Sequence, residues 1–258
     1  MLIARRRDQS KHPQLWDGLA GAWYPGAGPS GNTLYDLSGR DNHGTLTNMD
    51  AATDWVVNRG QMVLDFDGTN DYINVPSALS SLSGKTTTLS LWVKLRSGSR
   101  FGGVLFGTNT GSSVFWQVNS NSSVFWVMGA SINISGVNLW DNTLHHIAAV
   151  SDGTTASVFV DGKIVGFNTV SATSLVAGAK NFVIGDWIGG LGGSFRINVQ
   201  LNDILIYNRA LHADEIKLLS QRPGIAYEPK RRVFYSIPSS VKAWLFRRQS
   251  QIIGGGLG

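Results

Sequence analysis

The chain has 258 residues, of which 42% are hydrophobic and only 15% are charged. This composition supplies enough apolar material for a large core, which excludes a wholly disordered chain. The chain has no cysteine, so disulfides, thiolate metal sites and cysteine nucleophiles are excluded as well.

The net charge of +5 is distributed unevenly. Residues 1–11 carry +3 and residues 217–258 carry +7, whereas the body between them carries −5. We therefore expect an acidic body with basic arms, which would bind an acidic protein surface, nucleic acid or anionic lipid. Aromatic residues interleaved in the second arm favour the protein surface, and no module for sequence-specific nucleic-acid recognition is present. Solvated tails that only improve solubility are the alternative.

Membrane insertion and secretion are not expected. No apolar run approaches the roughly 18 residues of a membrane span. The basic start of the chain, residues 1–12, is followed by no apolar stretch of the kind found in a secretory signal. We therefore expect a soluble protein without a signal peptide or a transmembrane segment.

Hydrophobic and polar residues alternate through most of the body, which is the pattern of half-buried β-strands. Strands are predicted, in chain order, at residues 61–66, 72–75, 88–95, 145–150, 157–160, 163–165 and 203–207. Turn signals separate them, among them Asp67-Gly68 and the two-residue hairpin turn Asp161-Gly162. Many short strands with regular turns predict a β-sandwich or jelly roll.

A short internal repeat predicts one hairpin in particular. The segment Ser-Ser-Val-Phe-Trp occurs at residues 112–116 and again at residues 122–126. We expect an antiparallel hairpin with aromatic residues paired across it.

One helix is predicted, at residues 212–220. Asp214 and Glu215 lie near its start, where negative charge suits the helix dipole. Ile216 and Leu219 give it an apolar edge, and Pro223 with the glycine after it ends the helix.

The chain changes character after this helix. It becomes basic and aromatic, and it is too short there for a core of its own. The predicted organisation is therefore a basic N-terminal arm over residues 1–18, a β domain over residues 19–222 and a basic, aromatic C-terminal tail over residues 223–258.

Seven segments carry recognisable motifs: YDLSG at 35–39, NHG at 42–44, LDFDGTNDYI at 64–73, TLSLWV at 88–93, HHIAAV at 145–150, VFVDG at 158–162 and DILIYNRAL at 203–211. In this order they resemble the motifs of laminin-G-like, concanavalin A-like jelly rolls, over roughly residues 19–220. The resemblance implies an all-β, concanavalin A-like jelly-roll sandwich with one short C-terminal helix, and the extended basic arms lie outside it.

The layout of the whole chain resembles virion proteins of tailed bacteriophages, with an Arg-rich start, a single laminin-G-like domain and a basic tail. This resemblance implies a non-enzymatic structural protein of the virion that decorates a capsid or tail. The expected partners are capsid or tail subunits and further copies of the chain. The predicted anchoring residues are Arg5, Arg6, Arg7, Arg231, Arg232, Arg247 and Arg248.

A carbohydrate-binding lectin or adhesin module is the alternative function. Sugar rings stack on exposed aromatic side chains. Trp140 and Trp187 are the candidates for contact with a host-surface glycan. Packing inside the sandwich is the alternative role for each tryptophan.

Catalysis is not expected. Retaining glucanases share this kind of sandwich and need two carboxylates about 5 Å apart, usually from glutamates. The only glutamates here are Glu215 and Glu228, near the end of the chain. His145 and His146 are adjacent on a predicted strand, so they face opposite sides. No Gly-x-Ser-x-Gly nucleophile elbow is present.

Calcium is the candidate cofactor. Asp67, Asn70 and Asp71 form an oxygen-rich turn of the kind that hard cations prefer. The laminin-G-like resemblance implies a structural calcium with Asp71 and Asp203 as ligands. The alternative is that Asp67 and Asn70 only stabilise their own turn through the backbone.

Overall fold

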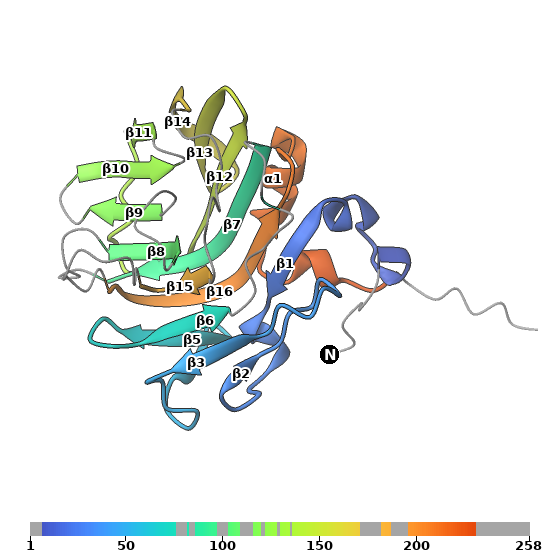
Figure 1. Ribbon diagram of the computed structural model, residues 1–258, viewed down its shortest axis with the longest axis vertical. Coiled ribbons are helices and arrows are strands. Elements are labelled where there is room, and N and C mark those ends of the chain that lie inside the picture. Colours follow the sequence, from blue (N-terminus) through green and yellow to red (C-terminus); the bar gives the residue numbers. More distant parts are fainter. Residues whose placement is uncertain are drawn as a thin grey trace, which may run out of the picture.

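The computed structural model describes residues 7–75, 82, 86–96, 103–108, 116–119, 122–127, 130–134, 136–170, 182–186 and 196–230. The predicted sandwich is confirmed, because these residues form two antiparallel sheets stacked face to face (Figure 1). No helix within the described residues is long and apolar enough to cross a membrane.

The first sheet has the strand order β14-β13-β12-β7-β16-β5-β4, and β1 pairs with β16 beside this path. Its strands are β1 Leu19–Trp23, β4 Trp55–Asn58, β5 Gln61–Asp67, β7 Thr86–Leu95, β12 His145–Asp152, β13 Thr155–Val160, β14 Lys163–Thr169 and β16 Asn198–Tyr207. The long strands β7 and β16 pair with each other near the centre of this sheet.

The second sheet has the strand order β11-β10-β9-β8-β15-β6-β3-β2. Its strands are β2 Thr33–Leu34, β3 Gly44–Thr47, β6 Tyr72–Val75, β8 Gly103–Thr108, β9 Trp116–Asn119, β10 Ser122–Val127, β11 Ala130–Asn133 and β15 Phe182–Ile184. The hairpin expected from the repeat is present as β9 and β10. Its register places Val118 opposite Phe125 and Gln117 opposite Trp126, so the expected pairing of aromatics is wrong within the described residues.

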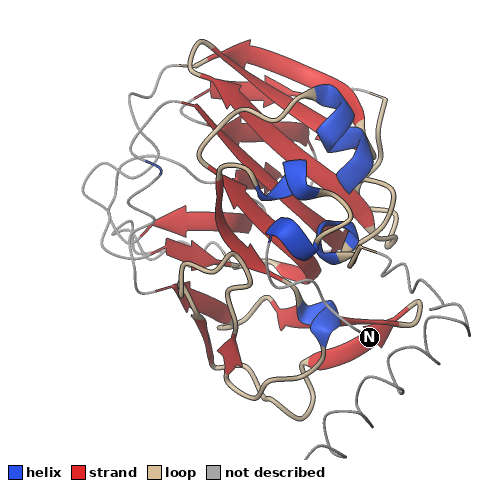
Figure 2. Ribbon diagram, turned by 90° about the vertical axis from the view of Figure 1, so that its right-hand side faces the viewer, coloured by secondary structure: helices blue, strands red, loops and turns tan. Residues whose placement is uncertain are grey.

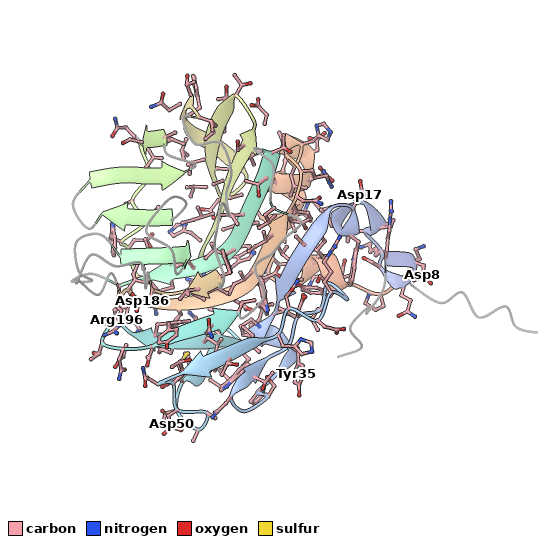
Figure 3. All side chains as sticks on the ribbon, in the orientation of Figure 1. Asp8, Asp17, Tyr35, Asp50, Asp186 and Arg196 are labelled. Carbon is pink, nitrogen blue, oxygen red and sulfur yellow. The ribbon has the colours of Figure 1, made fainter. Side chains whose placement is uncertain are left out.

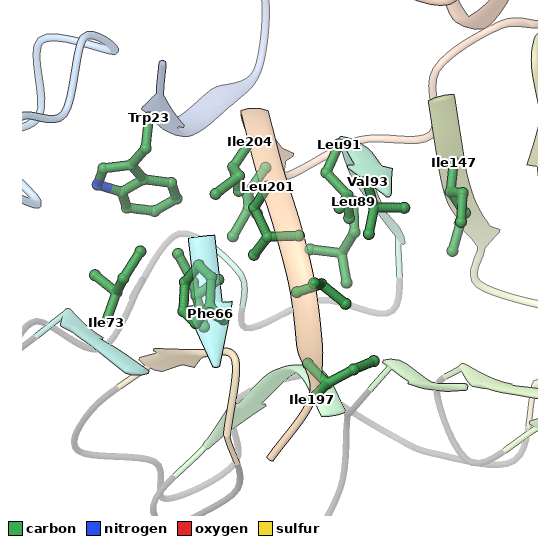
Figure 4. Close-up of a cluster of buried hydrophobic side chains, with 14 of the residues drawn as sticks. Trp23, Phe66, Ile73, Leu89, Leu91, Val93, Ile147, Ile197, Leu201 and Ile204 are labelled. Atoms are coloured by element: carbon green, nitrogen blue, oxygen red, sulfur yellow. The ribbon is translucent and has the colours of Figure 1, made fainter. Parts of the chain in front are cut away.

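The core lies between the sheets (Figure 4). Alternate residues of β7, such as Leu89, Leu91 and Val93, point into it, as the sequence pattern predicted. The fully buried ring of Trp23 stacks on Phe182 of the other sheet, with ring centroids 6.4 Å apart. Apolar contact of this kind across the sandwich supplies most of the free energy that stabilises it.

Helices cover the outer face of the first sheet, and Figure 2 shows them together on that side. They are η2 Pro13–Trp16, η3 Pro25–Ala27, α1 Ala213–Leu219 and η5 Ile225–Tyr227, and η1 Arg7–Gln9, which buries no residue, precedes them. The predicted helix is confirmed as α1, with His212 as its N-cap and Glu215 closing a capping box. A second apolar cluster lies beneath these helices, so the sheet is buried on both faces there.

Candidate functional site

The two ends of the described chain are paired with each other. Ser10 and Pro229 form an antiparallel bridge outside the main sheets. One backbone hydrogen bond flanks the bridge on each side, from Lys11 N to Glu228 O at 2.7 Å and from Lys230 N to Gln9 O at 2.8 Å. We call residues 7–16 and 222–230 together the terminal clasp.

Three basic side chains of the terminal clasp contact one carboxylate, that of Glu228. Its Oε2 lies 3.4 Å from Lys11 Nζ and 3.2 Å from His12 Nε2, and Arg222 binds its Oε1. Burial acts to raise the pKa of Glu228, but the contact with His12 and the charges of Arg222 and Lys11 outweigh it and lower the pKa. The N-terminal and C-terminal segments are therefore joined by side chains as well as by backbone.

The terminal clasp is also fixed to the sandwich. Within the clasp, Ser10 Oγ and Trp16 Nε1 both donate to the carbonyl of Ala226, at 2.8 and 2.9 Å, and these bonds join its two segments. Tyr207 of β16 donates its hydroxyl to Leu15 O at 3.0 Å. The segment before residue 19 and the segment after residue 222, which lie outside the predicted limits of the β domain, thus pack on that domain.

Of the predicted anchoring residues, the structure describes only Arg7, in η1. Its guanidinium is exposed, 3.7 Å from the Asp17 carboxylate. The other six lie outside the described residues: Arg5, Arg6, Arg231, Arg232, Arg247 and Arg248.

Asp203, a predicted calcium ligand, faces the terminal clasp from β16. It is buried, and its Oδ2 accepts the Gly224 N–H at 2.7 Å. Burial raises its pKa from the ordinary 3.8 to about 7, against the opposing effect of the hydrogen bond from Gly224. The ring of Tyr227 is in turn stacked on Tyr24, with centroids 5.1 Å apart.

Asp71, the other predicted calcium ligand, precedes β6. Its Oδ2 accepts the Asp67 N–H at 2.9 Å, and burial raises its pKa to about 6. Asp67 Oδ1 accepts backbone N–H groups from Thr69 at 2.6 Å and from Asn70 at 3.4 Å. Asp67 therefore stabilises its own turn, which was the alternative to metal binding.

A guanidinium lies beside this turn (Figure 3). Arg196 Nε is 3.2 Å from Asp186 Oδ2, and its Nη1 donates to Thr69 O. Within the described residues, no three His, Asp or Glu side chains gather in an arrangement that could hold a metal ion. Calcium binding through Asp71 and Asp203 stays a prediction.

Of the two tryptophans predicted to bind a glycan, the structure describes only Trp140. Trp140 is half-buried, and its ring packs against the core between the sheets. Trp187 lies outside the described residues. Trp140 therefore offers only part of its ring to a ligand.

His145 follows the Trp140 loop and is held by two carboxylates. Its Nδ1 is 2.8 Å from Asp161 Oδ2, and its Nε2 is 3.1 Å from Asp141 Oδ1. The contact with Asp161 is the main cause that raises the pKa of His145. This network ties the start of β12 to the turn between β13 and β14.

His146 points to the other side, as expected, where it is fully buried against Trp92. Its Nε2 lies 2.9 Å from Ser90 Oγ. Burial lowers its pKa to about 3, so the ring is neutral. This Ser–His pair is closed to solvent, which suits a structural role.

Tyr35 is a candidate that its motif, YDLSG at residues 35–39, did not single out. It is 53% exposed (Figure 3), and its ring lies in a T-shaped arrangement with the ring of His43, with centroids 5.1 Å apart. The loop that follows Tyr35 is polar and includes the exposed Asp41. The exposed part of the Tyr35 ring therefore lies beside polar groups.

Asp36 makes this loop rigid. Its buried carboxylate accepts backbone N–H groups from Ala22 at 2.9 Å, Ser38 at 2.8 Å and Asn42 at 3.0 Å. The Tyr35 ring is therefore presented on a fixed support, which lowers the entropy cost of binding a ligand.

A comparison with known protein families matches residues 67–217, more than half of the chain, to the concanavalin A-like lectin/glucanases superfamily. No curated protein matches the sequence significantly.

Solved structures share the fold at low sequence identity. Trypanosoma rangeli sialidase is 18% identical with a TM-score of 0.55, and the match covers 79% of this chain and 32% of the sialidase. The binding domain of Paraclostridial Mosquitocidal Protein 1 is 15% identical with a TM-score of 0.57, covering 80% and 52%. The botulinum neurotoxin serotype D binding domain is 11% identical with a TM-score of 0.61, covering 81% and 52%. This chain thus spans about a third of the sialidase and about half of each toxin domain.

Proposed function

The chain belongs to the concanavalin A-like lectin/glucanases superfamily, and we propose that it is a non-enzymatic binding module displayed on a virion and anchored there by its basic arms. The observation that carries this proposal is the terminal clasp. Because Ser10 pairs antiparallel with Pro229, the chain enters the clasp and leaves it at the same place. Both arms therefore start from one point of the β domain.

Charge distribution supports the anchoring role. The sequence places Arg5, Arg6 and Arg7 just before the bridge and Lys230, Arg231 and Arg232 just after it. The body between the arms carries −5. A carboxylate-rich surface on a capsid or tail subunit, or on a further copy of the chain, would attract the arms and repel the body.

The side chains that could serve catalysis support a non-enzymatic role. The Ser90–His146 pair is buried. Glu215 is bound by Arg209 at 2.6 Å, and Glu228 is occupied in the terminal clasp. Neither glutamate is available as the acid or nucleophile of glycoside hydrolysis.

Truncation tests the proposal directly. A chain reduced to residues 7–230 keeps both segments of the terminal clasp, so we expect it to fold with an unchanged Tm. Particles assembled by the phage or prophage that encodes the chain are purified and analysed by mass spectrometry. We expect the full chain in the particles and the truncated chain to be lost from them. Absence of the full chain, or full incorporation of the truncated one, would contradict the proposal.

Glycan binding is the second candidate, and Tyr35 is the observation that favours it. An exposed aromatic face on a rigid, polar loop is the arrangement on which a sugar ring stacks. The two functions are compatible, because Tyr35 lies on β-domain residues that the anchoring arms do not include.

A further inference from the structure

We propose that His145 is a proton-controlled tie: its protonated ring joins the loop that carries Trp140 to the turn between β13 and β14, and its neutral ring releases that loop. We call residues 136–144, which lie between β11 and β12, the Trp140 loop. This inference goes beyond the proposed anchoring function, because it concerns a conformational change within the β domain.

Asp161 is the fixed side of the tie. It lies in the two-residue turn between β13 and β14, beside the start of β12 (Figure 1). Its N–H donates to His146 O at 2.8 Å, and its Oδ1 accepts the His146 N–H at 2.9 Å. Its other oxygen, Oδ2, lies 2.8 Å from His145 Nδ1. The two backbone bonds hold Asp161 in place whether or not the ring of His145 is protonated.

Asp141 is the loop side of the tie. Its Oδ1 lies 3.1 Å from His145 Nε2, and it accepts the hydroxyl of Thr143 at 2.7 Å and the N–H of Thr143 at 2.9 Å. The Thr143 Oγ1 itself lies 2.9 Å from His145 Nε2. The carboxylate, the hydroxyl and the ring nitrogen are therefore all within hydrogen-bond distance of one another.

This geometry depends on one proton, because both ring nitrogens of His145 face carboxylates. A protonated imidazole donates from both nitrogens, so it bonds Asp161 through Nδ1 and Asp141 through Nε2, whereas a neutral imidazole has a single N–H. The shorter contact, with the firmly held Asp161, keeps that N–H. Nε2 then becomes an acceptor, and the Thr143 hydroxyl turns from the carboxylate to the ring. Asp141 thus loses the bonds from both the ring and the hydroxyl.

The charged groups around His145 favour the protonated ring. The contact with Asp161 is the main cause that raises its pKa, Asp141 adds to it, and burial opposes both. From β7, the apolar Val93 lies opposite His145, and β14 begins with the exposed Lys163 after the turn. The side chain of His145 is 16% exposed, so solvent can supply the proton without unfolding.

The direction of the pH effect follows from the raised pKa. Because the pKa of His145 lies above its ordinary 6.5 in the folded chain, the tie is at full strength below pH 6.5 and is lost as the pH rises through the folded pKa. Burial acts to raise the pKa of Asp141 and of Asp161, but hydrogen bonds from Thr143 to the first and from His145 to the second outweigh it. Both carboxylates therefore stay ionised throughout this range.

The neighbouring histidine does not contribute to the effect. His146 is fully buried, and burial lowers its pKa to about 3, so it stays neutral while His145 titrates. We expect the Trp140 loop to be rigid in mild acid and loose in mild alkali. A ligand that contacts Trp140 would then bind more tightly in acid, because a rigid loop loses less entropy on binding.

NMR spectroscopy of the isotopically labelled full chain from pH 5 to pH 9 tests the tie. Ring correlations of His145 give its titration midpoint and its tautomer, and amide order parameters report on the Trp140 loop. In the wild type we expect protons on both ring nitrogens at pH 5 and only on Nδ1 at pH 9. Over the same range the order parameters of residues 140–143 should fall from about 0.85 to below about 0.6.

Two variants should move the titration in opposite directions. Asp141→Asn removes the negative charge beside Nε2, so His145 should titrate at a lower pH than in the wild type. Thr143→Val removes the hydroxyl that donates to the neutral ring, so His145 should titrate at a higher pH. Asp152→Asn is the matched control. It removes a carboxylate at the far end of β12 that binds only backbone N–H groups of its own turn among the described contacts, and it should behave like the wild type.

A neutral ring at pH 5, a proton on Nε2 at pH 9, or loop order that stays constant while His145 titrates would overturn the tie. So would an unchanged midpoint in Asp141→Asn. Should that variant fail to fold, a midpoint in Thr143→Val at or below the wild-type value would overturn it as well. The measurement uses no particle, so its failure and that of the truncation test are independent.

Discussion

The burial of a single residue depends on neighbours that are distant in the sequence, as Tyr35 and Asp203 show. Alternation placed His145 and His146 on opposite sides of a strand, and the structure confirms this. The sequence could not show that Asp203 is buried, because the cover comes from Tyr227, which lies in a segment predicted as a tail. Nor could it distinguish the exposed Tyr35 from the half-buried Trp140, since exposure depends on how distant loops pack.

Tyr35→Ala tests glycan binding at this residue. Loss of the stacking face should weaken binding to a soluble oligosaccharide by about tenfold, because aromatic stacking contributes up to about 1.5 kcal/mol. Tyr35→Phe keeps the ring and is the matched control, which should bind like the wild type. An oligosaccharide array read by fluorescence provides the probe, with affinities then measured by calorimetry. Equal binding by Tyr35→Ala, or no binding by the wild type, would contradict the glycan role.

At the scale of elements, local signals predicted seven of the described strands, one hairpin and one helix, but they did not show which part of the fold each element covers. The Asp161-Gly162 turn was predicted, and both residues have positive φ, at 48° and 78°. Arg59 and Gly60 adopt nearly the same pair of angles, at 49° and 79°. The turns differ in surroundings: a Cβ on Gly162 would lie 2.5 Å from Ser220 Oγ, whereas one on Gly60 would meet nothing within 4 Å.

This contrast gives a matched pair of substitutions. Gly60→Ala should destabilise the fold by about 1 kcal/mol, the cost of a left-handed conformation for a residue with a Cβ. Gly162→Ala should cost at least about 1 kcal/mol more, because its methyl group also displaces the end of α1 from the hairpin. Urea unfolding followed by tryptophan fluorescence measures both. Equal costs would show that the hairpin does not pack on α1.

For the whole molecule, the sequence predicted an acidic body with basic arms, and the structure adds that the arms start together. The bridge between Ser10 and Pro229 joins residues at opposite ends of the described chain. No local sequence pattern predicts this contact, because the contact depends on the pairing of β1 with β16 in the folded sandwich. The family motifs end before it, so the resemblance did not reveal it either.

A disulfide across the bridge tests this convergence most directly. Ser10 and Pro229 are the non-hydrogen-bonded pair between two flanking bonds, where Cα atoms lie about 4.5 Å apart, within the range of a disulfide. The chain has no cysteine of its own. The double variant Ser10→Cys/Pro229→Cys is oxidised in air and its free thiols are counted. The control is Ser10→Cys/Lys230→Cys, whose second side chain points to the other face.

We expect complete oxidation of the first variant, a Tm above that of its reduced form, and stabilisation of about 3 kcal/mol, with free thiols persisting in the control. Two free thiols in the first variant, or equal oxidation of both, would contradict the claim that the two ends of the described chain meet.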